Sequence, residues 1–188
     1  GYRNFHAFQR AAAAQFNERV ESPAHQFRRS TMRQPKIDVP LVTGDIFECL
    51  RETFEMIDER EFRKIVRLLA NERRNVCTIG GQSTHVYADI LAARLYQFRP
   101  GVRSVGGQPL GYNEGNQLPF LGPRDVVVAF DFRRYQESTI RFARIAAGQG
   151  SSIVLFTDTW LSPIADFAHH VLTIEPGGRL PYDFMTPC

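Results

Sequence analysis

The spacing of apolar residues changes near residue 74 and divides the chain into two parts. Before that point, apolar side chains recur about every 3.6 residues, a period typical of amphipathic helices. The pattern predicts one helix over residues 4–20, a second that begins at Thr43, and a third that carries residues 62–69. Thr43 is the expected N-cap of the second helix, because its hydroxyl can accept a hydrogen bond from a free N–H of the first turn.

Beyond residue 74, short apolar runs alternate with helical patterns. Strands are predicted at residues 75–79, 102–105, 125–130, 152–157 and 170–174, and helices at about 83–98, 113–120, 135–148 and 162–168. Strands that alternate with helices form right-handed βαβ units and a parallel sheet that is covered on both faces. The predicted fold is therefore α/β: a flavodoxin-like three-layer α-β-α sandwich with a five-stranded parallel sheet, preceded by N-terminal helices.

The composition fits one compact domain with an appended segment, since the chain has 188 residues and is 43% apolar. No apolar run approaches the roughly 20 residues needed to span a membrane, and no secretory signal is visible. The three cysteines are odd in number and follow no spacing pattern, so a reducing, cytoplasmic location is expected.

Charge is unevenly distributed along the chain. Residues 1–34 contain six arginines against two glutamates, a net charge of +4, whereas the whole chain carries only +3. A basic segment of this kind either faces nucleic acid or forms a solvated amphipathic helix, and the charge alone favours the helix. Two prolines then predict a linker over residues 35–42.

Two polar loops follow the first and third predicted strands. Ligands of open α/β sheets bind at the carboxyl ends of the strands, where the strand order reverses, so these loops predict a binding cleft. The first loop, residues 80–84, is rich in glycine and opens a helix, whose free N–H groups attract anions. A tight turn in which Ser83 or Thr84 caps the helix explains the same residues equally well.

The second loop, residues 131–135, places two arginines side by side. Arg133 and Arg134 could bind phosphate or carboxylate in bidentate fashion. Asp131 would repel a phosphate, so the alternative is an Asp–Arg pair that stiffens the loop or contacts another subunit. The candidate ligand-binding residues are Gly81, Gln82, Ser83, Thr84, Asp131, Arg133, Arg134 and Tyr135.

Other segments carry weaker signals. The loop of residues 157–162 is expected at the rim of the same cleft with a structural role, because Ser162 followed by Pro163 predicts a helix start. No metal-ligand spacing and no nucleophile–base signature appears in the sequence, so no metal, cofactor or catalytic residue is predicted.

Three segments, residues 79–88, 125–139 and 157–165, resemble the sugar isomerase (SIS) domain, as in the C-terminal half of RpiR/MurR-type transcription regulators. The resemblance covers residues 43–188. It implies that residues 1–34 are a helical connector from an N-terminal helix-turn-helix domain that is missing here. It also implies that the C-terminal helix is truncated. In this family, hydroxyls on the first two loops hold a sugar phosphate, and the domain dimerises.

The loops differ from the family pattern at named positions. Thr84 falls where the phosphate-binding serine of the first loop is expected, and Gln82 replaces the second glycine of that loop. Residues 131–136 stand in place of a Ser-x-Ser-Gly-x-Thr run and keep none of its hydroxyls. An acidic or hydroxylated metabolite bound by Arg133 and Arg134 is therefore an alternative ligand to a sugar phosphate.

These observations predict the effector-sensing and oligomerisation domain of a bacterial transcription regulator, and not an enzyme. The expected partners are a small-molecule effector, a homodimer or tetramer of this chain, and DNA only through the missing domain, with no membrane. One alternative is a sugar-phosphate isomerase, which needs an acid and a base. Its candidates would be His85, Glu114 and Glu137. Another is a dimerisation module with a vestigial site.

Overall fold

The computed structural model describes residues 39–105 and 118–175. The helix predicted over residues 4–20, the connector expected at residues 1–34, Glu114 and the C-terminal helix that the sequence analysis expected to be cut short all lie outside the described residues. The chain divides into two compact units, residues 51–175 and residues 1–50 with 176–188. The sheet lies entirely in residues 51–175, and the domain boundaries expected from the sequence stay predictions.

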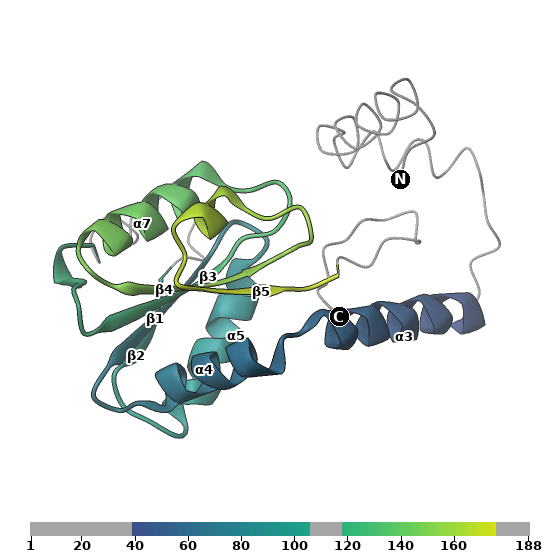
Figure 1. The fold of residues 1–188 in the computed structure, drawn as a ribbon, viewed down its shortest axis with the longest axis horizontal. Coiled ribbons are helices and arrows are strands. Elements are labelled where there is room, and N and C mark those ends of the chain that lie inside the picture. Colours follow the sequence, from purple (N-terminus) through teal and green to yellow (C-terminus); the bar gives the residue numbers. More distant parts are fainter. Residues whose placement is uncertain (1–38, 106–117, 176–188) are drawn as a thin grey trace. The chain divides into compact units, whose positions relative to one another are not determined.

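The predicted five-stranded parallel sheet is confirmed (Figure 1). Its strands are β1 (Asn75–Gly80), β2 (Val102–Val105), β3 (Asp125–Phe130), β4 (Ser152–Thr157) and β5 (His170–Thr173). They lie in the order β2-β1-β3-β4-β5, and every neighbouring pair is parallel. The strands were predictable because strands buried on both faces are nearly continuous apolar runs.

Helices cover both faces of this sheet. They are α4 (Glu59–Ala70), α5 (His85–Tyr96), α7 (Glu137–Gly148) and the short 3-10 helices η1 (Leu118–Phe120) and η2 (Pro163–Asp166). The helix α3 (Val39–Met56) precedes them in the chain. Figure 1 shows α4 and α5 on one face of the sheet and α7 on the other, where η2 also packs against α7. The three-layer sandwich is therefore confirmed.

Alternate residues of the central strands face the two helical layers. On β3, Val127 and Ala129 belong to the core cluster that contains Phe142 of α7, and every residue of the strand is buried. Successive side chains of a strand point to opposite faces. Val126, Val128 and Phe130 therefore face the layer of α4 and α5, where Ile65 and Ala88 are buried. This packing fixes the ends of the strands, from which the candidate site is built.

The start of α3 corrects the sequence interpretation. The helix begins at Val39, so Thr43 lies inside it rather than at its N-cap, and the end of the expected linker is helical. Pro40 explains the difference, because a proline is tolerated in the first turn, where its missing N–H would have no partner within the helix. A proline near a helix start therefore did not mark a linker.

Candidate functional site

The candidate site lies where the strand order reverses. After β1 the chain adds β2 on one side, and it then returns to add β3 on the other side of β1. Gly80 at the end of β1 pairs in register with Phe130 at the end of β3, which in turn pairs with Phe156 of β4. The loops that follow these three strands, residues 80–84, 131–136 and 157–162, therefore leave the same edge of the sheet.

Thr84 joins the first loop to β3. Its side chain is buried, and its Oγ1 accepts a hydrogen bond from the Gly81 N–H at 2.7 Å and donates one to the Phe130 carbonyl at 2.7 Å. Thr84 occupies the N-cap position of α5, but its hydroxyl makes no bond to the first turn. The capping role considered for this hydroxyl is therefore wrong, and the side chain instead connects two strand ends. The exposed Ser83 lies beside it on the loop.

Gly80 is required by the turn itself. A Cβ at this position would lie 2.5 Å from the carbonyl carbon and oxygen of Thr84, which are backbone atoms that cannot move aside. The missing side chain lets the start of α5 pass directly over the end of β1. The tight turn expected from the sequence is therefore present, whatever ligand the loop holds.

Asp131 holds the second loop to the third. Its carboxylate is 2% exposed, and it accepts hydrogen bonds from the Ser162 hydroxyl at 2.5 Å and from the Gln136 N–H at 3.1 Å. Burial raises the pKa of Asp131 to about 6, although these two hydrogen bonds act in the opposite direction. The carboxylate is thus held by a hydroxyl and a backbone amide rather than by an arginine, which corrects the Asp–Arg pair considered above.

Asp158, which the sequence analysis did not select, positions the arginine loop. This fully buried carboxylate accepts hydrogen bonds from the Arg133 N–H at 2.6 Å, the Tyr135 hydroxyl at 2.6 Å and the Trp160 N–H at 3.0 Å. An acidic residue directly after a buried strand was the available signal. The Tyr135 hydroxyl therefore holds the arginine loop to Asp158, and the Arg133 backbone is held there through its N–H.

The two arginines differ in their surroundings. The Arg133 guanidinium carbon lies 4.3 Å from the centre of the Trp160 ring, a cation–π arrangement, and the side chain is half-buried. Arg134 is exposed. Of the predicted residues, the structure joins Gly81 and Thr84 by a direct contact, whereas Arg133 and Tyr135 are joined through Asp158.

Gln136 connects the two predicted loops and was also missed. Its side-chain Oε1 accepts a hydrogen bond from the Gln82 N–H at 2.6 Å, across 54 positions of sequence. Its own N–H donates to Asp131. No local pattern identifies such a contact, because it depends on the pairing of β1 with β3. The glutamine nevertheless brings exposed Gln82 and buried Asp131 into one hydrogen-bonded chain with Ser162.

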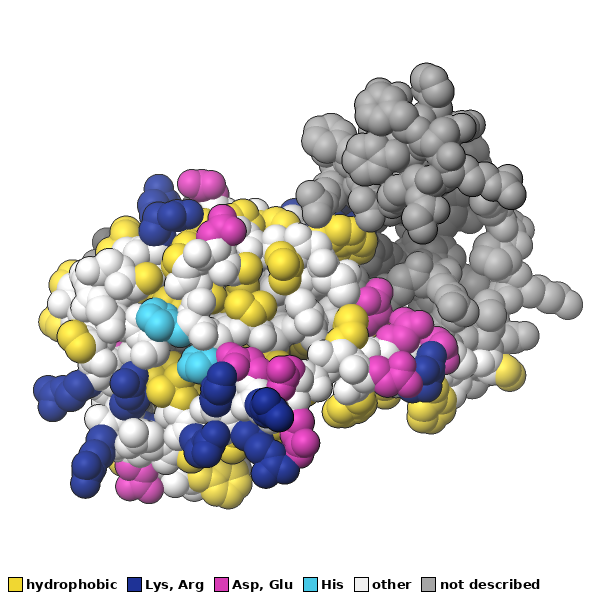
Figure 2. All heavy atoms as spheres, in the orientation of Figure 1, with side chains coloured by type: hydrophobic (Ala, Val, Ile, Leu, Met, Phe, Trp, Pro, Cys, Tyr) yellow, Lys and Arg dark blue, Asp and Glu magenta, His cyan; other side chains and the backbone are white. Residues whose placement is uncertain are grey.

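Basic side chains also occur outside the second loop, where they are dispersed over the surface (Figure 2). Figure 2 shows Lys and Arg side chains spread over the surface around α4. Two of them, Arg63 and Lys64, pair with Glu59 and Glu61 of the same helix. Exposed pairs of this kind on one helix contribute little to stability, and they reduce the net positive charge of the surface.

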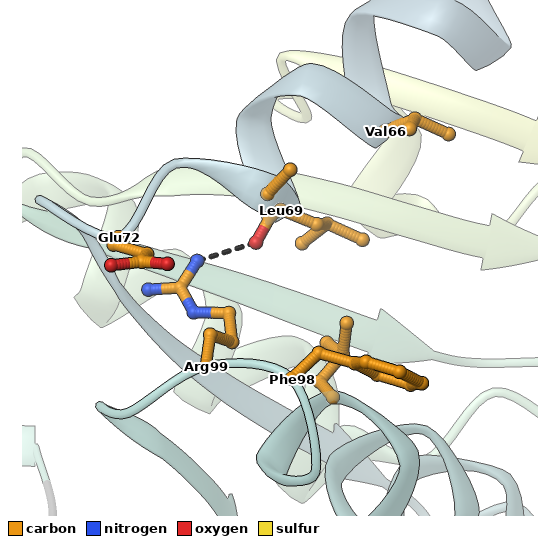
Figure 3. A pocket seen from close by; sticks show the side chains of 7 residues that line it. Val66, Leu69, Glu72, Phe98 and Arg99 are labelled. Carbon is orange, nitrogen blue, oxygen red and sulfur yellow. Dashed lines mark hydrogen bonds between the residues drawn. The ribbon is translucent and has the colours of Figure 1, made fainter.

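A separate hollow lies between α4 and the end of α5 (Figure 3). It has a volume of about 270 Å³ and is lined mostly by apolar side chains, with Val66, Leu69, Ala70, Glu72, Leu95, Phe98 and Arg99 around it. The buried guanidinium of Arg99 donates to the backbone carbonyls of Leu69, Arg74 and Pro100. Its guanidinium is therefore bonded to the backbone of the protein. None of the predicted ligand-binding residues lines this hollow.

The fold is an α/β domain, and its candidate site lies at the switch point of a parallel sheet, where such folds bind ligands. Residues 68–178, more than half of the chain, match the family of SIS domains, and the chain belongs to this family. The resemblance stated from the sequence is confirmed. Among the described residues, no group of three or more His, Cys, Asp or Glu side chains could hold a metal ion. No described helix has the length and apolar character needed to cross a bilayer.

Relatives and solved structures agree with this assignment. An uncharacterised HTH-type transcriptional regulator of Haemophilus influenzae is 25% identical over 127 residues, which are 68% of this chain and 43% of the relative. The chain thus spans less than half the length of that regulator. The sugar isomerase domain of an RpiR transcription factor from Sphaerobacter thermophilus is 25% identical, with a TM-score of 0.64, over 76% of this chain and 77% of that one.

A third similar structure is the NanR protein of Vibrio vulnificus, which was solved in complex with ManNAc-6P. The TM-score is 0.63 and the identity 16%, over 98% of this chain and 61% of that one. This likeness shows the fold.

Proposed function

We propose that this chain is the effector-sensing domain of a bacterial RpiR-type transcription regulator. It binds a sugar phosphate or another small anionic or hydroxylated metabolite between the loops that follow β1 and β3. The observation that carries the proposal is the junction of these loops at the switch point, where Asp158 fixes the backbone of Arg133. Similarity to the RpiR domain of Sphaerobacter thermophilus, at 25% identity, supports the regulator class.

Signal transmission follows from oligomerisation. The domain forms a homodimer or tetramer, and the bound effector favours one arrangement of its subunits. An effector can shift such an equilibrium only by binding the two arrangements with different affinity. The arrangement sets the spacing of separate helix-turn-helix domains of the full-length protein against DNA half-sites. The regulator acts in the cytoplasm.

The proposal assigns no catalytic step to this chain. An isomerase requires a base and an acid at the reacting carbons. His85 Nδ1 lies 2.8 Å from the Gln82 carbonyl, and it must be the donor of this hydrogen bond, since a carbonyl oxygen can only accept. Glu137 is exposed at the start of α7. Turnover of an aldose or ketose phosphate by the purified chain would contradict the proposal and favour the isomerase.

Ligand-induced stabilisation tests the sensor directly. The thermal midpoint is measured against sugar phosphates, sugar acids, nucleotides and dicarboxylates. A ligand that binds only the native state at 100 times its Kd stabilises it by about 2.7 kcal/mol. Arg133→Ala should abolish the response to the best ligand. Arg141→Ala, which removes an exposed arginine of α7, should leave it unchanged.

Two results would contradict the proposed site. An Arg133→Ala variant that responds as the parent does would move the ligand away from the arginine loop. A parent that responds to no member of the panel at millimolar concentration would favour a dimerisation module whose cleft is vestigial.

A further inference from the structure

We propose that Gln136 determines which acidic group this cleft accepts, and that the intact chain selects a carboxylate over a phosphate. The Gln136 side chain already accepts the hydrogen bond that the Gln82 N–H of the first loop could donate to a ligand. A phosphate can therefore bind this N–H only after the Gln136 side chain moves away. This inference rests on the proposed function, because it concerns the same cleft. It narrows the ligand class to a hydroxylated carboxylic acid, such as a sugar acid.

The position of the amide oxygen is the first argument. Gln136 Oε1 lies 2.6 Å from the Gln82 nitrogen, and a Cβ built on buried Gly81 would lie 2.5 Å from the same oxygen. The amide oxygen therefore lies directly over the backbone that the first loop would present to an anion. A phosphate oxygen bound to the Gln82 N–H would occupy the same space.

Two further donors of the first loop are also engaged. The Gly81 N–H donates to Thr84 Oγ1, and the Thr84 hydroxyl donates to the Phe130 carbonyl. Thr84 is 4% exposed, so its hydroxyl proton is directed into the protein rather than toward the cleft. A phosphate needs several donors for its oxygens, and three donors of this loop are already bonded within the protein.

The backbone of Gln136 is anchored independently of its side chain. Its N–H donates to Asp131 at 3.1 Å, and its carbonyl accepts from Ile140 at 3.0 Å in the first turn of α7. The side chain can therefore rotate away while the loop stays in place. Loss of one side-chain contact is the change that would open the first loop.

The arginine loop offers the remaining recognition chemistry. The paired N–H groups of a guanidinium bind two oxygens of a carboxylate or of a phosphate alike. A carboxylate has no further oxygen, whereas the remaining oxygens of a phosphate need donors, of which the first loop has already engaged three. Arg133 is held at its amide by Asp158, and Arg134 is exposed beside it. A carboxylate bound by these side chains leaves the contact between Gln136 and Gln82 intact, and hydroxyls of the ligand can face exposed Ser83.

The test compares gluconate with glucose 6-phosphate and inorganic phosphate by calorimetric titration. The parent should bind gluconate at least tenfold more tightly than glucose 6-phosphate. Gln136→Ser, whose short side chain cannot reach Gln82, should bind inorganic phosphate at least tenfold more tightly than the parent. Gln149→Ser, at an exposed glutamine that follows α7, is the matched control and should behave as the parent does.

Unchanged phosphate affinity in a folded Gln136→Ser variant would overturn the inference. If that variant does not fold, Gln136→Glu decides, since it keeps an acceptor in the same place and adds a negative charge. It should weaken phosphate binding at least threefold relative to the parent, and unchanged or tighter binding would overturn the inference. Amide hydrogen exchange at Gln82 gives a readout without ligand, because exchange should accelerate in Gln136→Ser and an unchanged rate would contradict the contact.

The failure of this inference and that of the proposed function are distinguishable. If the parent shows an Arg133-dependent response to some metabolite but Gln136→Ser gains no phosphate binding, the sensor stands and the role of Gln136 falls. If the parent responds to nothing while Gln136→Ser gains phosphate binding, the role of Gln136 in blocking the first loop stands and the proposed sensor function falls.

Discussion

The loop edge of the sheet and the hollow between α4 and α5 use buried charge in opposite ways. At the hollow, the buried cation Arg99 donates hydrogen bonds to three backbone carbonyls and so has a structural role. At the loop edge, buried anions, Asp131 and Asp158, accept from loop donors. Of the cationic side chains there, Arg134 is exposed and Arg133 is half-buried against Trp160. The difference shows that a hollow is not by itself a site, because the buried charge beside this one is bonded to the backbone of the fold.

Replacing Arg99 should have the largest effect. Arg99→Met leaves the buried carbonyl of Leu69 and two part-buried carbonyls without donors. An unsatisfied buried group costs about 1–3 kcal/mol, so we expect a total loss of about 4 kcal/mol in the free energy of unfolding. Urea unfolding measures it, with Arg94→Met at an exposed position of α5 as the control. A loss no greater than that of the control would mean that Arg99 does not hold the end of α4.

Asp131 should make stability depend on pH in a specific direction. Its pKa in the folded protein is about 6, above the ordinary value of 3.8, so the folded state binds more protons between these values. Its contribution to stability is therefore fully present below pH 4 and is lost as the pH rises through about 6. At about 1.4 kcal/mol per pKa unit, the total change is about 3 kcal/mol.

The measurement compares the parent with Asp131→Asn, which cannot titrate. The difference between their free energies of unfolding should change by most of this amount between pH 4 and pH 7, because other groups contribute equally to both proteins. A difference that stays constant over this range would show that the Asp131 carboxyl titrates as it does in water.

Asp158→Asn should have a smaller effect on stability and a large one on ligand response. The amide keeps one acceptor oxygen, but its NH₂ group must oppose one of the loop donors now held by the carboxylate, at a cost of about 2 kcal/mol. Arg133 then loses its fixed position, and the ligand-induced thermal shift should disappear. Asp166→Asn, at an exposed position, serves as control. A preserved shift would mean that Asp158 is not needed to position Arg133.

The sequence predicted the sheet better than the site, for a physical reason. Strands such as β3 are buried on both faces and consist almost entirely of apolar residues, so their positions can be predicted from the local sequence. The roles of Gln136, Asp158 and Ser162 depend on partners that only strand pairing brings close. Thr84 lies on the first loop as expected, but its hydroxyl bonds Gly81 and Phe130 rather than the helix, which local capping rules could not foresee.

The lengths of the strands have a consequence for how the sheet meets other chains. The outer strands β2 and β5 each have four residues, whereas the three inner strands each have six. An outer strand exposes unpaired backbone groups that can recruit a strand from another molecule, and a short one offers few of them. This sheet is thus a poor template for edge-to-edge growth, which favours a protein that stays dispersed when it is concentrated.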